Sequence, residues 1–341
     1  FDWYNRTTSD ILTTANLPAT LGADAPYENM GTIQTKGWEL AIDYRHTFKN
    51  GLHFGVTASV ADDKTEVTKW TYNTKIPSYG ATGWWDKSAY KEGMVLGDIW
   101  GLQFDRFLTE DDFNADGSLK AGLPDQTKVF PAGYQFAPGD VLYKDLDNNG
   151  EIVKQTNTND KGDLSVIGNA LPRLQFGLNL DAAWKGFDIS MFFQGVAKRK
   201  LWAAGNQVLP GFTTGEPFYK GAEDYWTPEN TDAFYPRPMD YKQSASGNYS
   251  VNDRYLLNMA YLRLKTFTVG YSLPKVWLSK FKVQGLRVYF TGENLFTIDG
   301  VKPAIDPEIG IRTASGKSDQ RNFGRSYPYQ KTVSFGIQLS L

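Results

Sequence analysis

The residues best suited to chemistry form a short acidic segment with the spacing of a calcium-binding loop. Asp145, Asp147 and Asn149 place oxygen atoms at the first, third and fifth positions of such a loop, and Gly150 stands at the sixth, where the backbone turns sharply. Glu151 follows directly. A hard divalent cation takes about six to eight oxygen ligands, and side chains at these positions supply several of them. The spacing therefore predicts a site for Ca²⁺.

The last ligand of this loop is displaced along the chain. A carboxylate normally stands at the twelfth position, where this sequence has Thr156, and Asp163 takes its place after an insertion. The alternative is a metal-free turn, in which Asp, Asn and Gly residues hold the backbone through side-chain hydrogen bonds. A second segment, Asp112–Leu119, matches the first eight positions but has Leu123 at the twelfth.

Aromatic residues make up 15% of the chain, and several lie in long segments rich in glycine and proline. Sugar rings stack on indole and phenol rings, so these aromatics are candidates for carbohydrate contact. Trp84 and Trp85, which are adjacent and distant from any strand pattern, are the preferred substrate-binding residues. The other candidates are Trp70, Trp202, Phe212, Phe218, Tyr219, Tyr225 and Trp226. The alternative is that such rings form interfacial belts or the small cores of long loops.

The composition argues against catalysis and against nucleic-acid binding. The chain has two histidines, His46 and His53, no cysteine, no serine elbow and no phosphate-binding glycine loop in a strand-to-helix context. We therefore predict that it is not an enzyme. Its 36 basic residues are balanced by 38 acidic ones without a basic run, which removes the electrostatic footprint of a nucleic-acid-binding protein.

The segments that must position these residues alternate between apolar and polar side chains, which is the period of a β-strand. Strands are predicted at residues 38–44, 52–60, 174–184, 187–193, 261–273, 286–298 and 332–341. The segment 261–273 breaks the strict alternation, and this predicts a bulge. No comparable stretch has a helical apolar period, so the chain is predicted to be all-β.

Strand and connection lengths favour an antiparallel transmembrane β-barrel. Several strands reach the roughly 9–11 residues that cross a bilayer at a tilt. Very short turns, Lys49–Gly51 and Lys185-Gly186, alternate with long segments such as Ala203–Asn258 and Asp299–Tyr327, as periplasmic turns and extracellular loops do. The apolar side of each strand is then expected to face outer-membrane lipid.

Two stretches bear on the extent of the barrel. In the region 71–171, candidate strands at Gly93–Phe107 and Val141–Lys144 either span the membrane or form a hairpin inside one large external loop. We favour the loop, because spanning strands would need a long link on the short-turn side. The first residues, Phe1–Arg6, have the pattern of the end of a strand, and we expect the chain to be a fragment of a longer one.

Several motifs occur in one order along almost the whole chain. They lie at Asn29–Leu40, Pro138–Ile152, Val166–Leu180, Tyr225–Arg237, Asp253–Pro274, Leu286–Thr297, Asp306–Gly310 and Tyr327–Leu341. In register and order they resemble the C-terminal third of the SusC/RagA-type TonB-dependent outer-membrane transporters. Each motif alone is weak, but their shared order makes the resemblance strong.

The resemblance implies a plugged barrel of about 22 strands, in which residues 1–341 form a single barrel segment of about eight to ten strands with long extracellular loops. The plug, the N-terminal strands and the TonB-contacting segment would lie upstream. A SusD-like surface lipoprotein would serve as a lid, and two transporter–lipoprotein pairs would form a dimer. The transporter would lie in the outer membrane of a Gram-negative bacterium and import oligosaccharides, or peptides in some members.

A rival hypothesis uses the same aromatic residues differently. The chain could be a secreted, soluble all-β carbohydrate-binding module or adhesin. The two hypotheses differ in what the apolar strand faces contact, because a soluble sandwich buries them against a second sheet whereas a barrel turns them toward lipid.

Overall fold

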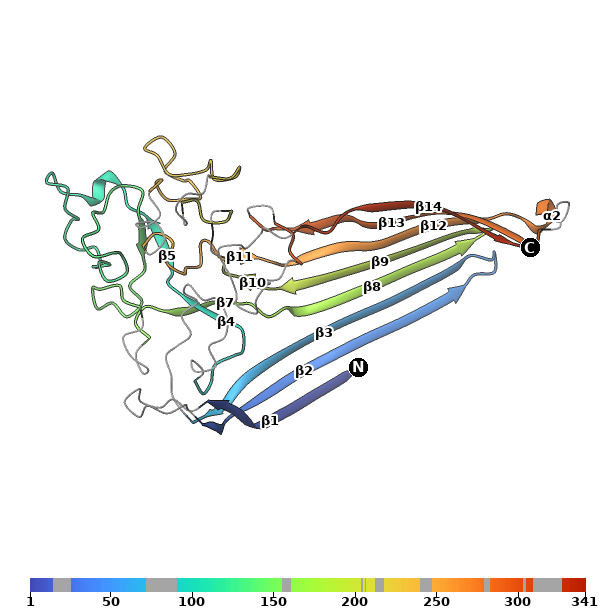
Figure 1. Cartoon of the computed structure of the whole chain (residues 1–341), viewed down its shortest axis with the longest axis horizontal. Coiled ribbons are helices and arrows are strands. Elements are labelled where there is room, and N and C mark those ends of the chain that lie inside the picture. The colour runs from blue at the N-terminus through green and yellow to red at the C-terminus, as the bar shows by residue number, and fades with distance from the viewer. Residues whose placement is uncertain are drawn as a thin grey trace.

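The computed structural model describes residues 1–14, 26–71, 91–154, 161–203, 205, 207–211, 218–239, 247–278, 283–302, 305–308 and 327–341. Eight long strands form one antiparallel sheet in the order β1-β2-β3-β8-β9-β12-β13-β14 (Figure 1). These strands are β1 (Asp2–Thr14), β2 (Tyr27–Thr47), β3 (His53–Trp70), β8 (Arg173–Trp184), β9 (Phe187–Lys198), β12 (Tyr261–Ser272), β13 (Gly285–Asp299) and β14 (Thr332–Ser340). The chain is therefore all-β, as predicted.

Apolar residues of neighbouring strands lie opposite one another across the whole sheet. Val56 pairs with Leu180, Leu180 with Met191, and Phe290 with Phe335, so the alternation within each strand becomes one continuous apolar face. This face is exposed, and Phe335 retains 83% of its accessible surface. Within the described ranges, no second sheet packs on it, which is the opposite of a sandwich core.

The bulge and the turns follow their local sequence. The register of β12 shifts between Leu264 and Thr266 against both of its neighbours, so the predicted bulge is confirmed. Lys185 and Gly186, which join β8 to β9, have φ angles of +48° and +88°. Positive φ at both central residues is the turn geometry that matches the twist of a tight hairpin.

The connections between the strands differ in length at the two ends of the sheet. Short turns join β2 to β3 and β8 to β9 at one end of the sheet, and the long segments gather at the other end (Figure 1). β3 pairs directly with β8, and the described residues between these two strands lie outside the sheet, as expected for a single large loop. The sheet of this chain consequently has eight strands, the lower bound of the expected number.

Two sequence expectations need correction. The first residues are not the end of a strand, because β1 continues to Thr14; its Thr- and Ser-rich second half hides the alternation. The hairpin predicted from Gly93–Phe107 and Val141–Lys144 is also replaced by two separate pairs of strands. β4 (Asp98–Gly101) pairs with β7 (Ser165–Asn169), and β5 (Phe104–Phe107) pairs with β6 (Val141–Tyr143). The break falls at Leu102, whose backbone N–H donates to the carbonyl oxygen of Val251.

The long segments have hydrophobic cores of their own. One cluster surrounds Trp202, Tyr235 and Tyr255, and a second surrounds Phe130 and Trp226. Short elements complete this loop region: β10 (Lys200–Leu201), β11 (Leu257–Asn258) and the 3₁₀ turn Glu110–Asp112. The helix α2 (Lys275–Leu278) lies at the opposite end of the sheet (Figure 1). No helix in the described part of the chain has the length and apolarity of a membrane span.

Candidate functional site

The acidic loop brings together three of its five predicted ligands. Carboxylate oxygens of Asp145, Asp147 and Asp163 lie within 4.8 Å of one another, although Asp163 is distant in sequence. The other two residues bond elsewhere. The Asn149 side-chain oxygen accepts the backbone N–H of Glu151 at 2.8 Å, and the Glu151 carboxylate pairs with Lys128.

The backbone of this loop turns as a calcium loop does. Gly150 has a φ of +86°, and its N–H donates to Asp145 at 2.8 Å. The N–H of Asn149 donates to Asp147 at 3.1 Å. These bonds would also hold a metal-free turn, so the specific feature is the approach of Asp163. Asp163 is buried, and the N–H groups of Leu146 and Val153 fix its two oxygens.

Crowding of like charges perturbs the exposed part of this cluster. Desolvation, together with the carboxylates of Asp145 and Asp163, raises the pKa of Asp147. Desolvation also acts on Asp145, but the backbone N–H donors, chiefly that of Gly150, outweigh it and lower the pKa of that residue. All the donors are oxygens, which fit a hard cation such as Ca²⁺ rather than a metal that prefers sulfur or nitrogen.

The second acidic segment is built differently. The Asp112 carboxylate accepts two bonds from Arg106, at 2.5 and 2.8 Å, and one from the N–H of Thr109 at 2.8 Å. Its charge is therefore balanced by a guanidinium. Of the described acidic groups, only the Asp145 cluster has the proximity that a metal ion requires.

The aromatic candidates separate into three groups. Trp84, Trp85 and Phe212 lie outside the described residues. Trp202 and Trp226 are buried in the two loop cores, and Trp70 is also buried, so these three have the structural role that the alternative predicted. Phe218, Tyr219 and Tyr225 instead line one pocket.

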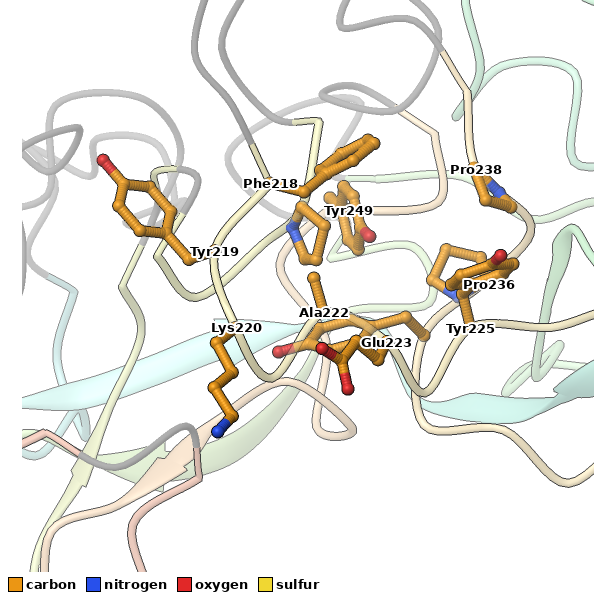
Figure 2. A pocket seen from close by; sticks show the side chains of 11 residues that line it. Phe218, Tyr219, Lys220, Ala222, Glu223, Tyr225, Pro236, Pro238 and Tyr249 are labelled. Carbon is orange, nitrogen blue, oxygen red and sulfur yellow. The ribbon is translucent and has the colours of Figure 1, made fainter.

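This aromatic pocket has a volume of about 580 Å³ in the loop region. Its walls consist of Pro210, Phe218, Tyr219, Lys220, Ala222, Glu223, Tyr225, Tyr235, Pro236, Pro238 and Tyr249. Figure 2 shows Phe218 and Tyr249 on one side of it and Tyr225 and Pro236 on the other. Phe218 and Tyr225 keep 57% and 41% of their surface exposed, so both rings are accessible to a ligand.

Deeper residues hold these walls in place. The hydroxyl of Tyr235 donates to the Val208 carbonyl oxygen at 2.9 Å, and the N–H of Trp226 donates to the Tyr235 carbonyl oxygen at 3.0 Å. Burial, followed by the charge of Asp224, raises the pKa of Tyr235 to about 12. Burial also raises the pKa of Tyr249 well above its usual range. Both hydroxyls are therefore protonated at neutral pH, and these two tyrosines add no charge to the pocket lining.

A buried ion pair fixes two of the walls. The carboxylate of Asp140, which is fully buried, accepts bonds from Arg237 at 2.8 Å, Asn248 at 2.9 Å and the Tyr134 hydroxyl at 2.8 Å. Arg237 stands between Pro236 and Pro238, and Asn248 precedes Tyr249, so one carboxylate anchors both the proline wall and the tyrosine wall. The sequence offered little signal for this arrangement, because Arg237 and Asn248 lie about a hundred residues from Asp140 along the chain.

The chain is similar to curated proteins over nearly its whole length. It is 27% and 26% identical to the TonB-dependent receptors P3 and P26 of Formosa agariphila, and 22% identical to the TonB-dependent receptor SusC of Bacteroides thetaiotaomicron. The matches cover 99%, 99% and 100% of the chain but 32%, 32% and 29% of those proteins, so the chain spans about a third of their length. No protein-family model matches the chain.

Solved structures share the fold. The RagAB peptide transporter superposes with a TM-score of 0.66 at 20% identity, covering 99% of the chain and 32% of the transporter chain. The RagAB peptide importer in its closed-closed state gives a TM-score of 0.64 at 18% identity, over 99% of the chain and 33% of the importer chain. The eight-stranded sheet and its one-sided loop region are thus the architecture of a segment of such a transporter barrel.

Proposed function

We propose that this chain, a homologue of the SusC-type TonB-dependent receptors, forms part of the wall and the extracellular loops of an outer-membrane importer of nutrients. The observation that carries the proposal is the wide exposed apolar face of the sheet, with long loops at one end only. In a barrel, such a face meets lipid and the polar face lines the lumen. Residues 1–341 are then one barrel segment, and additional strands complete the cylinder.

The rival hypothesis, a soluble carbohydrate-binding module or adhesin, fits this surface poorly. An exposed apolar face that extends over eight strands far exceeds the patches that soluble monomers carry. We do not propose an enzymatic activity for this chain. The relatives are named as receptors, and the work of transport would come from TonB rather than from a reaction in this chain.

The proposed substrate is an oligosaccharide. The aromatic pocket supports it, since accessible Phe and Tyr rings bind the C–H faces of sugar rings and a lining without net charge suits a neutral ligand. Lys220 and Glu223 on the wall cancel each other in charge and offer hydrogen bonds to hydroxyl groups. A peptide is the second candidate, favoured by the name of the RagAB peptide transporter.

We further propose the partners that this architecture requires. A SusD-like lipoprotein would cover the loop end, TonB would act through a part of the protein outside this chain, and two such pairs would assemble. The location would be the outer membrane of a Gram-negative bacterium. The acidic loop would bind Ca²⁺ through Asp145, Asp147 and Asp163 and so hold the large loop between β3 and β8 in one conformation.

Two experiments test this function. The full-length protein should fractionate with outer membranes and change its gel mobility on heating; a fully soluble protein without a mobility shift would contradict the barrel. In cells that depend on the transporter, Phe218→Ala and Tyr225→Ala should then reduce uptake of the preferred glycan. Phe48→Ala, which removes an exposed aromatic ring at the opposite end of the sheet, is the control. Reduced uptake of peptides but not of glycans would favour the second substrate.

A further inference from the structure

The connection between β12 and β13 has an exposed apolar surface to which the proposed import function assigns no role. It includes α2, at the short-turn end of the sheet (Figure 1). Leu278 is buried, and α2 contacts β13, so the helix is docked by one side. On its other side, Val276 and Trp277 keep 76% and 60% of their surface exposed. Two adjacent exposed apolar side chains at the end of a larger apolar face indicate a contact surface for a partner or a membrane.

This surface continues the apolar face of the sheet. At the same end, Phe187 is exposed and its ring lies 4.5 Å from that of Tyr271 on the neighbouring strand. The ladder extends one step beyond β12, since the N–H of Leu273 donates to the Leu286 carbonyl oxygen. Only Pro274 separates Leu273 from α2. Along the chain, Trp277 therefore follows closely on Tyr271, at the same end of the sheet as these apolar rings.

Cationic side chains accompany these rings. Lys185 lies 4.5 Å from the centre of the Trp184 ring, which is itself exposed at this end, and Lys275 is exposed at the first position of α2. Aromatic rings with adjacent lysines are the composition of a membrane–water interface, where the rings enter the acyl boundary and the ammonium groups meet phosphate. A four-residue helix offers no groove for a protein segment.

From this continuity we infer that α2 is an interfacial anchor for phospholipid on the short-turn side of the membrane. Val276 and Trp277 insert at the boundary between headgroups and acyl chains, and Lys275 lies at the level of the phosphates. The anchor would fix the depth of the β12–β13 hairpin in the bilayer. This role is independent of which substrate the loops select.

The absence of cysteine from this chain permits a direct test. In the full-length protein, with any cysteine elsewhere replaced, Trp277→Cys and separately Val276→Cys are spin-labelled and reconstituted in vesicles of phosphatidylethanolamine and phosphatidylglycerol. Collision rates with oxygen, which concentrates in lipid, and with a water-soluble nickel chelate report depth. Phe335→Cys on the apolar face and Lys49→Cys in the β2–β3 turn are the hydrocarbon and water references.

Labels at positions 276 and 277 should collide more often with oxygen than with nickel, at a depth shallower than that of position 335. Nickel collision rates equal to those at position 49 would overturn the inference, because α2 would then project into water. Protection from both reagents would also overturn it and indicate a protein partner. A water-exposed label at position 335 would contradict the membrane placement of the whole sheet and the anchor with it.

Discussion

At the scale of single residues, the buried carboxylate of Asp140 holds together parts of the loop region that are distant in sequence. It bonds to two distant residues, Arg237 and Asn248, and its charge is balanced by Arg237, whose side chain is largely buried. Arg237→Met would leave this carboxylate buried without a countercharge. Breaking a buried pair in this way costs about 3–5 kcal/mol, so we expect amide exchange in residues 134–141 to accelerate strongly. Arg45→Met is the matched control, since the Arg45–Asp43 pair is exposed and contributes at most about 1 kcal/mol.

The second prediction at this scale concerns the cation. Asp145→Asn and Asp163→Asn should each abolish a calcium-dependent rise in the melting temperature of the full-length protein, whereas Asp116→Asn, in the acidic segment without a cluster, should preserve it. Calorimetry with and without chelator measures the effect. An unchanged calcium response in both cluster variants would favour the metal-free turn.

The pKa of Asp147 gives this prediction a direction in pH. The folded-state pKa of Asp147 lies above the ordinary value of 3.8. In the calcium-free protein, the stabilising contribution of Asp147 is therefore complete below pH 3.8 and is lost as the pH rises through the raised pKa. Calcium binds the ionised form, so its stabilising effect should grow over the same interval. The calcium-induced shift in melting temperature should therefore shrink on acidification, which a pH series of melting curves checks.

Sequence spacing located part of these sites. It identified Asp145, Asp147 and Asp163, because loop positions relative to a glycine turn are a local property. The Glu151 carboxylate, also predicted as a ligand, pairs with Lys128, which approaches from a separate segment. Trp202 and Trp226 belong to cores, and the walls formed by Tyr235 and Tyr249 were missed, because only the packing of distant segments decides which rings are buried.

At the scale of elements, a polar clasp joins a loop to the sheet. We define the clasp as Arg263, Lys265, Asp306 and Glu308. Arg263 on β12 bonds to Asp306 at 2.7 Å and to Glu308, and Lys265 bonds to Glu308 at 2.7 Å. Desolvation opposes ionisation of Asp306, but its bonds, led by that from Arg263, lower the pKa of this residue. Its contribution to stability is therefore present above the ordinary value of 3.8 and is lost only as the pH falls through the lowered pKa.

Glu308→Gln should open this clasp. The substitution leaves two cations with a single carboxylate in a largely buried setting, and leaving a buried charge unpaired is strongly destabilising. We expect faster proteolysis of the β13–β14 connection in intact cells. Glu229→Gln, at an exposed loop position, should leave the rate unchanged. Equal rates in both variants would mean that the clasp does not restrain this connection.

Elements themselves were predictable wherever the signal is local. Period-2 alternation located seven of the eight long strands of the described sheet, and its interruption within 261–273 predicted the bulge. The two small sheets in the loop region were not separable from sequence. β4 and β5 follow one another in a single segment, and they divide at Leu102, whose backbone bonds to Val251 instead of to a strand partner.

At the scale of the whole molecule, adjacent residues of β14 distinguish a membrane wall from a soluble sheet. Ile337 pairs with Val288 on the apolar face, and Gln338 pairs with Arg287 on the polar face. In a bilayer, Ile337→Arg places a charge in hydrocarbon, at a cost of about 2–4 kcal/mol near the midplane. Gln338→Arg puts the same charge into the lumen, where water screens it and Asp188 already balances the charge of the neighbouring Arg287. Ile337→Arg should therefore lower the folded fraction in lipid vesicles far more than Gln338→Arg, as urea titration with heat-modified gel mobility measures. If the sheet were soluble, Ile337, which is 73% exposed, would accept arginine freely and the two variants would unfold alike.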